Sequence, residues 1–293
     1  MELREIPRIA ANEFRPSRWG GEPRVVVGNV KSWKALQLWD PDYLRSAIGE
    51  QYIPIRETDG PPRNIYQNLA QGGKVAFTQY LDWVLDTANA ADIRNIEKKY
   101  SDVSDITRAI CKSGFEASYY LNIELEELSK KLLQDIEIPN WYKGRPSVVN
   151  FWCGILGTSS GLHSDIAPNC NVQVRGHKHF ILFSPRQAKF LYQGLGITHC
   201  LFDPNLPDFD RFPLGRKASG WQCRLKPGDS LYIPVGWFHQ VTVTSKWALN
   251  VNFFWPRPFP QGVLTPSLWR LFMRKGWARW HIFLASSMNK GIK

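Results

Sequence analysis

Short apolar runs alternate with turn residues through the second half of the chain, and this pattern predicts a β-rich core. From Ser147 onward, runs rich in Val, Ile, Phe and Tyr are interrupted by Gly and Pro. Many short strands in succession favour an antiparallel sandwich or barrel. We expect strands over residues 148–155, 171–174, 178–183, 221–225, 230–234, 238–243 and 247–255.

The first half carries longer amphipathic stretches that favour helices. Leu125, Leu128 and Leu132, for example, recur at helical spacing and form one apolar stripe. We expect a buried strand at residues 25–27 followed by a turn at Gly28-Asn29. We further expect helical segments over 33–44, 77–87 and 122–133, a charged helix and loop over 92–105, and a further helix over 266–290.

Composition indicates a folded protein with a basic surface. The 293 residues are 43% hydrophobic and 13% aromatic, enough to bury a sizeable core in one large domain or two small ones. The net charge of +11 favours anionic partners such as nucleic acid, acidic peptides or a phospholipid surface. A basic surface without any such partner is the alternative.

The cysteines and the N-terminal residues predict a reducing compartment. The 5 cysteines are scattered without a C-x-x-C pair, which argues against a disulfide framework or structural zinc. No signal-peptide pattern opens the chain, and no uncharged apolar run is long enough to span a bilayer. We therefore expect a soluble cytoplasmic protein, and a nuclear location stays open if the source is a eukaryote.

A candidate metal site begins at His163-Ser164-Asp165. Residues i and i+2 of a strand leave the same face, so His163 and Asp165 could bind one ion together. In the run 238–243, His239 alternates with polar residues and shares the apolar face, where an imidazole needs a partner. A bond to a backbone carbonyl is the structural alternative for His239.

The turn after this run bears on what lies beside His239. If Ser245 and Lys246 form a two-residue hairpin loop, His239 pairs with Asn252 and both face the core, with Asn250 opposite Val241. Ser-Lys is a poor residue pair for such a turn, so a longer loop is the alternative, and a shift of one residue would reverse the faces.

Two histidines and one carboxylate form the facial triad that binds non-haem iron(II) and leaves coordination positions open. Zinc is less favoured, because structural zinc sites usually fill four protein positions. Lys178 opens an apolar strand without an acidic neighbour in sequence, so an acidic co-substrate could supply its counter-charge.

These residues resemble the JmjC/cupin-8 group of iron(II)- and 2-oxoglutarate-dependent oxygenases, which includes factor-inhibiting-HIF-like asparaginyl hydroxylases and tRNA wybutosine hydroxylases. The match runs over most of the chain. The segments that carry it are PRVVVG at 23–28 with Trp33 and Trp39, LHSD at 162–165, Asn169, GHKHFILFSP at 176–185, LKPGDSLYIP at 225–234, WFH at 237–239 and VNFFW at 251–255.

The resemblance implies roles for individual residues. His163, Asp165 and His239 would hold Fe(II), and Lys178 would pair with the distal carboxylate of 2-oxoglutarate. Ser160 stands where the family places a co-substrate-binding Thr, which is a departure that keeps the hydroxyl. The remaining matches to residues near the co-substrate or the metal are Asn169, Asn252 and Tyr120, although Tyr119 competes with Tyr120 for its place and ordinary structural roles stay open for Asn169 and Tyr120.

The resemblance also implies the fold and the activity. We expect a mainly β protein with flanking helices: an N-terminal α/β flank (1–146), a double-stranded β-helix or jelly-roll core (147–258) and a C-terminal helical segment (259–293) within one domain. The activity would be hydroxylation of an amino-acid side chain of a protein or peptide, with O2 as second co-substrate and succinate as product.

Other functions stay open from the sequence. A hypermodified tRNA base is the alternative substrate, which the basic charge fits, and a small natural product is another. A non-catalytic binding cupin is least favoured, because the triad and Lys178 are intact. The basic, aromatic C-terminal helix would form a homodimer interface, with a membrane-surface helix or a domain cap as alternatives.

Overall fold

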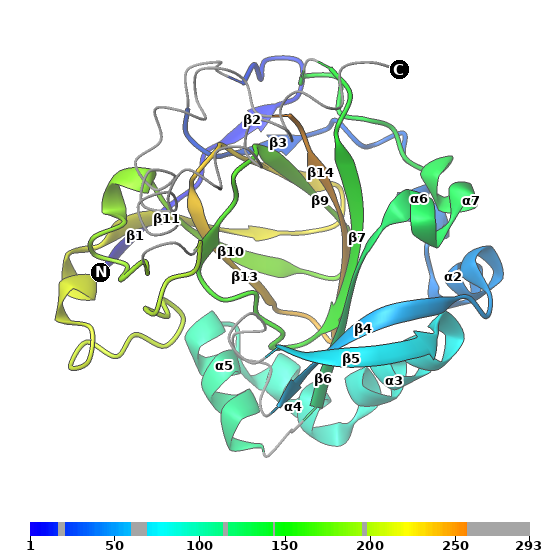
Figure 1. Ribbon diagram of the computed structural model, residues 1–293, viewed down its shortest axis with the longest axis horizontal. Coiled ribbons are helices and arrows are strands. Elements are labelled where there is room, and N and C mark those ends of the chain that lie inside the picture. Colours follow the sequence, from blue (N-terminus) through cyan, green and yellow to red (C-terminus); the bar gives the residue numbers. More distant parts are fainter. Residues whose placement is uncertain (17–20, 60–68, 114–116, 143, 195–197, 257–293) are drawn as a thin grey trace, which may run out of the picture.

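Two β-sheets form the centre of the molecule (Figure 1), and residues from both sheets line one cavity. The computed structural model describes residues 1–16, 21–59, 69–113, 117–142, 144–194 and 198–256. One sheet has five strands, in the order β1 (Glu2–Glu5), β11 (Ser219–Leu225), β10 (Lys178–Phe183), β13 (Phe238–Val243) and β8 (His163–Ser164).

The other sheet has nine strands and is extended by the N-terminal half of the chain. Its order is β2 (Arg8–Ala10), β3 (Arg24–Val27), β12 (Asp229–Ile233), β9 (Asn169–Arg175), β14 (Trp247–Phe254), β7 (Val148–Ile155), β6 (Ala117–Glu124), β4 (Tyr52–Asp59) and β5 (Leu69–Ala76). From β8 to β14 the chain passes repeatedly between the sheets, which is the expected jelly-roll core.

The predicted core strands are confirmed, and the predicted helices are confirmed in part. Residues 122–133 are not one helix, because Asn122 belongs to β6 and Ser129 adopts an extended backbone (φ −167°, ψ 120°) that interrupts the helix. The helices are α1 (Ala35–Leu38), α2 (Pro41–Ile48), α3 (Phe77–Asn89), α4 (Ala91–Lys99), α5 (Val103–Lys112), α6 (Leu125–Leu128) and α7 (Lys130–Leu133).

The charged stretch 92–105 has more structure than a solvated helix and loop. It spans α4 and the start of α5, and both helices bury isoleucines, such as Ile93 and Ile106, in a cluster with Leu156. The charged side chains occupy the other faces of these helices. Together with α3, these helices line the lower side of the molecule in Figure 1.

The predicted hairpin between β13 and β14 is wrong. The two strands lie in different sheets, with β13 between β10 and β8 and β14 between β7 and β9. The hydroxyl of Ser245 accepts a hydrogen bond from the backbone N–H of His177 (2.8 Å) and donates one to the carbonyl of Trp247 (2.7 Å). These contacts tie the bend to the turn between β9 and β10, so the chain crosses between sheets.

The polar face of β13 is buried under another part of the chain. Gln240 and Thr242 point away from the cavity as expected, yet they are only 2% and 1% exposed. Gln240 donates to the carboxylate of Asp203 (2.9 Å), and Thr242 accepts from the amide of Asn205 (2.7 Å). Segment 198–205 therefore covers this face.

The predicted C-terminal helix and its dimer interface lie outside the described residues. The division at residues 146 and 258 likewise stays a prediction, although β1, β2 and β3 already join the core sheets. Among the described helices, none is both long and apolar enough to cross a membrane.

Candidate metal and anion site

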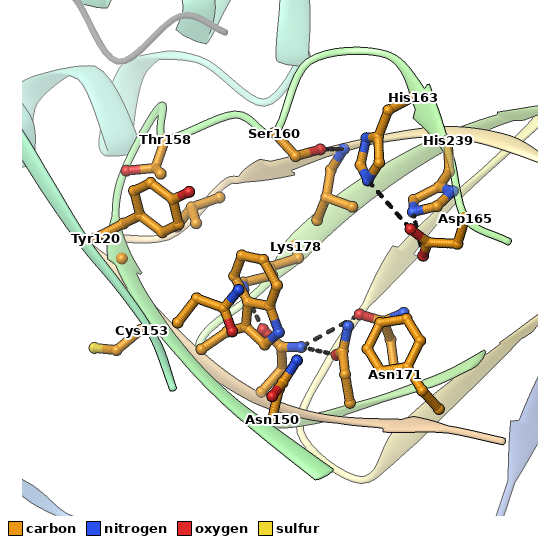
Figure 2. Close-up of a pocket in the computed structure, with 18 residues that line it drawn as sticks. Tyr120, Asn150, Cys153, Thr158, Ser160, His163, Asp165, Asn171, Lys178 and His239 are labelled. Atoms are coloured by element: carbon orange, nitrogen blue, oxygen red, sulfur yellow. Dashed lines mark hydrogen bonds and ion pairs between the residues drawn. The ribbon is translucent and has the colours of Figure 1, made fainter. Parts of the chain in front are cut away.

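The strand pair β8 and β13 brings the three predicted metal ligands together. His163 in β8 lies directly opposite His239 in β13, and Asp165 follows β8. The two imidazole rings have centroids 4.3 Å apart. Ligand atoms of the two histidines and Asp165 all lie within 4.8 Å of one another, and Figure 2 shows the three side chains converging at one side of the cavity.

Backbone carbonyls set the tautomer of both histidines. The Nδ1 atom of His163 lies 3.0 Å from the carbonyl oxygen of Gly161, and that of His239 lies 3.2 Å from the carbonyl of Trp237. Because a carbonyl only accepts, each Nδ1 carries a proton, and Nε2 is the nitrogen that each ring directs toward Asp165. The Nε2 atoms lie 4.0 Å (His163) and 3.5 Å (His239) from carboxylate oxygens of Asp165.

The protonation state of His163 also suits a metal ligand. Burial, and to a smaller extent the neighbouring His239, lower the pKa of His163 to about 4. The ring is therefore neutral near pH 7, as metal binding requires. Two imidazole nitrogens and one carboxylate are a donor set that fits iron(II) and leaves other coordination positions open.

Asp165 is held in place by its neighbours. The side-chain amide of Asn169 donates to its Oδ2 atom (2.7 Å), and the backbone N–H of Gly236 donates to its carbonyl oxygen (3.0 Å). Asn169 does not line the cavity but orients the carboxylate, which is the usual function of a residue behind a metal ligand.

Lys178 lies at the other end of the cavity. It pairs with Val243 in β13, four residues from His239, which is roughly 13 Å along a strand. The side chain is buried, and burial lowers the pKa of its ammonium to about 8. Among the described residues, its hydrogen bond goes to the neutral carbonyl of Asn250, and no carboxylate forms an ion pair with it. An incoming anion would therefore be stabilised here.

The cavity has a volume of about 250 Å³ and contains the other predicted co-substrate residues except Asn169. The Ser160 hydroxyl accepts from the backbone N–H of Val241 (3.1 Å) and donates to the carbonyl of Gly161 (3.1 Å). The buried Tyr120 ring stacks on Trp152, with centroids 6.0 Å apart. Asn252 faces the cavity from β14, so it lies across from His239 and not beside it in a hairpin.

Sequence reasoning missed several cavity residues. Thr158 is only 6% exposed and lines the cavity, and its hydroxyl makes no hydrogen bond to another described residue. Its spacing of two from Ser160 was the available signal, because both side chains then leave the same face of the chain. The other missed residues are Asn122, Asn150 and Asn171, together with Asn250, which was placed near the core without a role.

A third histidine lies next to the predicted metal ligands. Segment 198–200 pairs with β8, and the His199 ring stacks on His163 with centroids 5.5 Å apart and an interplanar angle of 17°. Burial lowers the pKa of His199 to about 4. Among the described residues it is not part of the convergent ligand set, and it packs against the His163 ring without lining the cavity.

The fold and this site define a protein of the cupin class. A family model described as "Cupin-like domain" matches residues 10–261. The "tRNA wybutosine-synthesizing protein 5" of Homo sapiens is 36% identical over 266 residues, covering 85% of this chain and 77% of the relative. The mouse protein of the same name is 41% identical over 263 residues, with the same coverage of 85% and 77%.

A relative with a different activity in its name matches nearly as much of the chain. The human "Bifunctional peptidase and (3S)-lysyl hydroxylase JMJD7" is 25% identical over 258 residues, covering 80% of this chain and 77% of the relative. The chain therefore belongs to the cupin-like family, the JmjC and cupin group of 2-oxoglutarate oxygenases, and it is an enzyme.

Proposed function

We propose that the chain is an iron(II)- and 2-oxoglutarate-dependent dioxygenase that hydroxylates an amino-acid side chain of a protein or peptide. The observation that carries the proposal is the arrangement of one cavity, with a His-Asp-His ligand set at one end and a buried lysine without a described carboxylate partner at the other. A metal and a dicarboxylic acid would satisfy both ends at once.

The three ligands would hold iron(II) on one side and leave the opposite side open to ligands. Iron(II) bound with 2-oxoglutarate and O2 supplies a two-electron oxidation that adds one oxygen atom to a substrate C–H bond, while the other enters succinate as CO2 leaves. His163 and His239 would present neutral Nε2 atoms, and Asn169 would keep the Asp165 carboxylate in position.

The far end of the cavity would bind the distal carboxylate of the co-substrate. The Lys178 ammonium would supply the charge, and the hydroxyls of Thr158 and Tyr120 would supply further donors. The Ser160 hydroxyl would donate to the co-substrate in exchange for its hydrogen bond to the Gly161 carbonyl. Because this end is buried, its interactions with an anion are stronger than in water, and bulk water is kept from the oxidation site.

Relatives support a protein or peptide substrate. One relative is named as a lysyl hydroxylase, and two others are named as lysine-specific demethylases, from Xenopus tropicalis and Arabidopsis thaliana. Their named targets are amino-acid side chains.

A second candidate substrate is a hypermodified tRNA base. The relatives at 36% and 41% identity carry names of tRNA wybutosine synthesis, and the net charge of +11 suits a polyanion. Salt-sensitive retention of tRNA would accompany this function.

The test is to incubate purified protein with iron(II), 2-oxoglutarate and ¹⁸O2 in the presence of protein extract or tRNA. Succinate should form only with iron(II), and mass spectrometry should find the label in a peptide. Label in a tRNA nucleoside would favour the second candidate. Asp165→Ala should abolish succinate formation, whereas Asp210→Ala, at an exposed carboxylate, should not. Absence of succinate under all conditions would contradict an oxygenase function.

A further inference from the structure

A chain of asparagine amides joins the two charged ends of the cavity. Lys178 Nζ donates to Oδ1 of Asn250, whose Nδ2 donates to Oδ1 of Asn171 (3.3 Å). The amide of Asn171 donates in turn to Asn169 (2.9 Å), and Asn169 donates to Asp165 Oδ2 (2.7 Å). The labelled side chains of Lys178, Asn171 and Asp165 mark this course in Figure 2.

The chemistry of the two ends fixes the direction of the whole chain. A lysine ammonium only donates hydrogen bonds, and an ionised carboxylate only accepts them. Each amide between them must therefore accept on the Lys178 side and donate on the Asp165 side. Asn252 accepts a further hydrogen bond from Nδ2 of Asn250, so the Asn250 carbonyl is held toward the ammonium.

This geometry orients the ammonium without neutralising it. Asn250 is only 2% exposed, and its carbonyl offers Lys178 a dipole and no net charge. An aspartate has almost the same shape and would form a buried ion pair with Lys178, which would remove the attraction for an incoming anion.

The other polar side chains that the nine-stranded sheet directs into the cavity are neutral as well. The nine-stranded sheet contributes amides at Asn122, Asn150, Asn171, Asn250 and Asn252. Among the described residues that line the cavity, Asp165 is the one carboxylate, and it lies at the metal end. The positive charge of Lys178 is thus left for a ligand.

We propose that Asn250 is a specificity-determining residue: its neutral amide makes the site select a co-substrate that ends in a carboxylate over one that ends in a neutral group. This inference rests on the proposed function, because it concerns the acid end of the same co-substrate. Asn171 and Asn252 are positioning residues that act through Asn250.

The test compares the binding of 2-oxoglutarate with that of its 5-amide, 2-oxoglutaramate, to the full chain loaded with manganese(II), by calorimetry without turnover. Wild type should bind the diacid about 30-fold more tightly or better, which is typical of a buried charge pair. Asn250→Asp should weaken diacid binding by about 30-fold and amide binding by less than about 3-fold, so the preference disappears. The ratio is informative because a purely structural defect weakens both ligands alike.

Two variants serve as controls. Asn89→Asp makes the same charge change at an exposed position and should leave both affinities unchanged. Asn250→Ser keeps a neutral acceptor and should keep the preference for the diacid. If circular dichroism shows that Asn250→Asp does not fold, the preference measured in Asn250→Ser tests the inference in its place. A preserved preference in folded Asn250→Asp, or a lost one in Asn250→Ser, would overturn the inference. Failure of wild type to bind either ligand would instead overturn the proposed function.

Discussion

Single side chains at the two ends of the cavity determine what it can bind. At one end, burial keeps the His163 ring neutral, and backbone carbonyls bind Nδ1 of both histidines, so that each Nε2 faces Asp165. At the other end, burial lowers the pKa of Lys178, because an ammonium loses its hydration there. Each end of the cavity therefore needs a ligand to complete its interactions. The protonation of Lys178 and the hydroxyl group of Thr158 each lead to a prediction about co-substrate binding.

Co-substrate binding should weaken as the pH rises above about 8. In the free protein the pKa of Lys178 is about 8, and a bound carboxylate should raise it. Binding then takes up a proton above that pH, so the dissociation constant should rise about tenfold per pH unit, and Lys178 should cause no change below it. Calorimetric titration of 2-oxoglutarate from pH 6.5 to 9.5 measures this. Lys178→Arg stays charged and should show a flat profile, and constant wild-type affinity to pH 9.5 would contradict the assignment.

Removing the Thr158 hydroxyl should weaken the co-substrate site specifically. The hydroxyl is buried and lines the cavity, and a hydrogen bond to a charged group contributes about 1.5–3 kcal/mol. Thr158→Val should therefore raise the KM for 2-oxoglutarate by about 10-fold or more while kcat changes by less than about 2-fold. Thr158→Ser keeps the hydroxyl and should behave like wild type. Equal effects of the two substitutions would indicate a packing role alone.

Turns between strands carry the chain from one sheet to the other and so align the two ends of the site. Among the described glycines, the closest approach to another segment occurs in the turn between β9 and β10. Gly176 has φ +65°, and a Cβ there would lie 2.1 Å from the carbonyl oxygen of Trp247 at the start of β14. At Gly176, two residues before Lys178, the β9–β10 turn therefore packs directly on the segment that crosses from β13 to β14.

Gly176→Ala should lower the free energy of unfolding by about 2–4 kcal/mol, from the left-handed backbone and from the clash with Trp247. Gly49→Ala is the control for backbone strain alone, because Gly49 (φ +69°, ψ −147°) has open space around it, and it should cost about 1–3 kcal/mol. Urea denaturation measures both values. Equal destabilisation would show that the Trp247 contact contributes nothing.

The molecule as a whole divides the site between its two sheets. The five-stranded sheet supplies both histidines and Lys178, and the nine-stranded sheet supplies the amides that face them. The Asp165–Asn169 and Lys178–Asn250 hydrogen bonds then connect the sheets at each end of the cavity. A metal bound at one end should stabilise the entire fold, since the unfolded chain has no preformed site.

Manganese(II) at about 100 times its dissociation constant should raise the free energy of unfolding by about 2.7 kcal/mol. Thermal unfolding with and without the metal measures this, and Asp165→Ala should remove the effect. An equal rise in the variant would place the metal elsewhere.

The core strands, and the convergence of the three predicted metal ligands, could be predicted from the sequence. Alternating polarity marks a strand such as 238–243 without knowledge of its partners, and the order of motifs from His163 to His239 indicates the ligands because few residue types bind iron. The interruption at Ser129 was not readable, because its backbone differs from the helical pattern of the leucines around it. The helix expected over 266–290 stays a prediction.

Only the tertiary structure revealed which strands are neighbours and which side chains are hydrogen-bonded to one another around the cavity. The placement of β13 and β14 in different sheets, the cover of segment 198–205 over Gln240, and the amide chain through Asn171 and Asn250 all join residues far apart in sequence. The sequence shows an asparagine or glutamine in a strand in the same way whether its side chain faces water or an ammonium group. Only the packing of distant segments decides which, because a hydrogen-bond partner is set by distance in space.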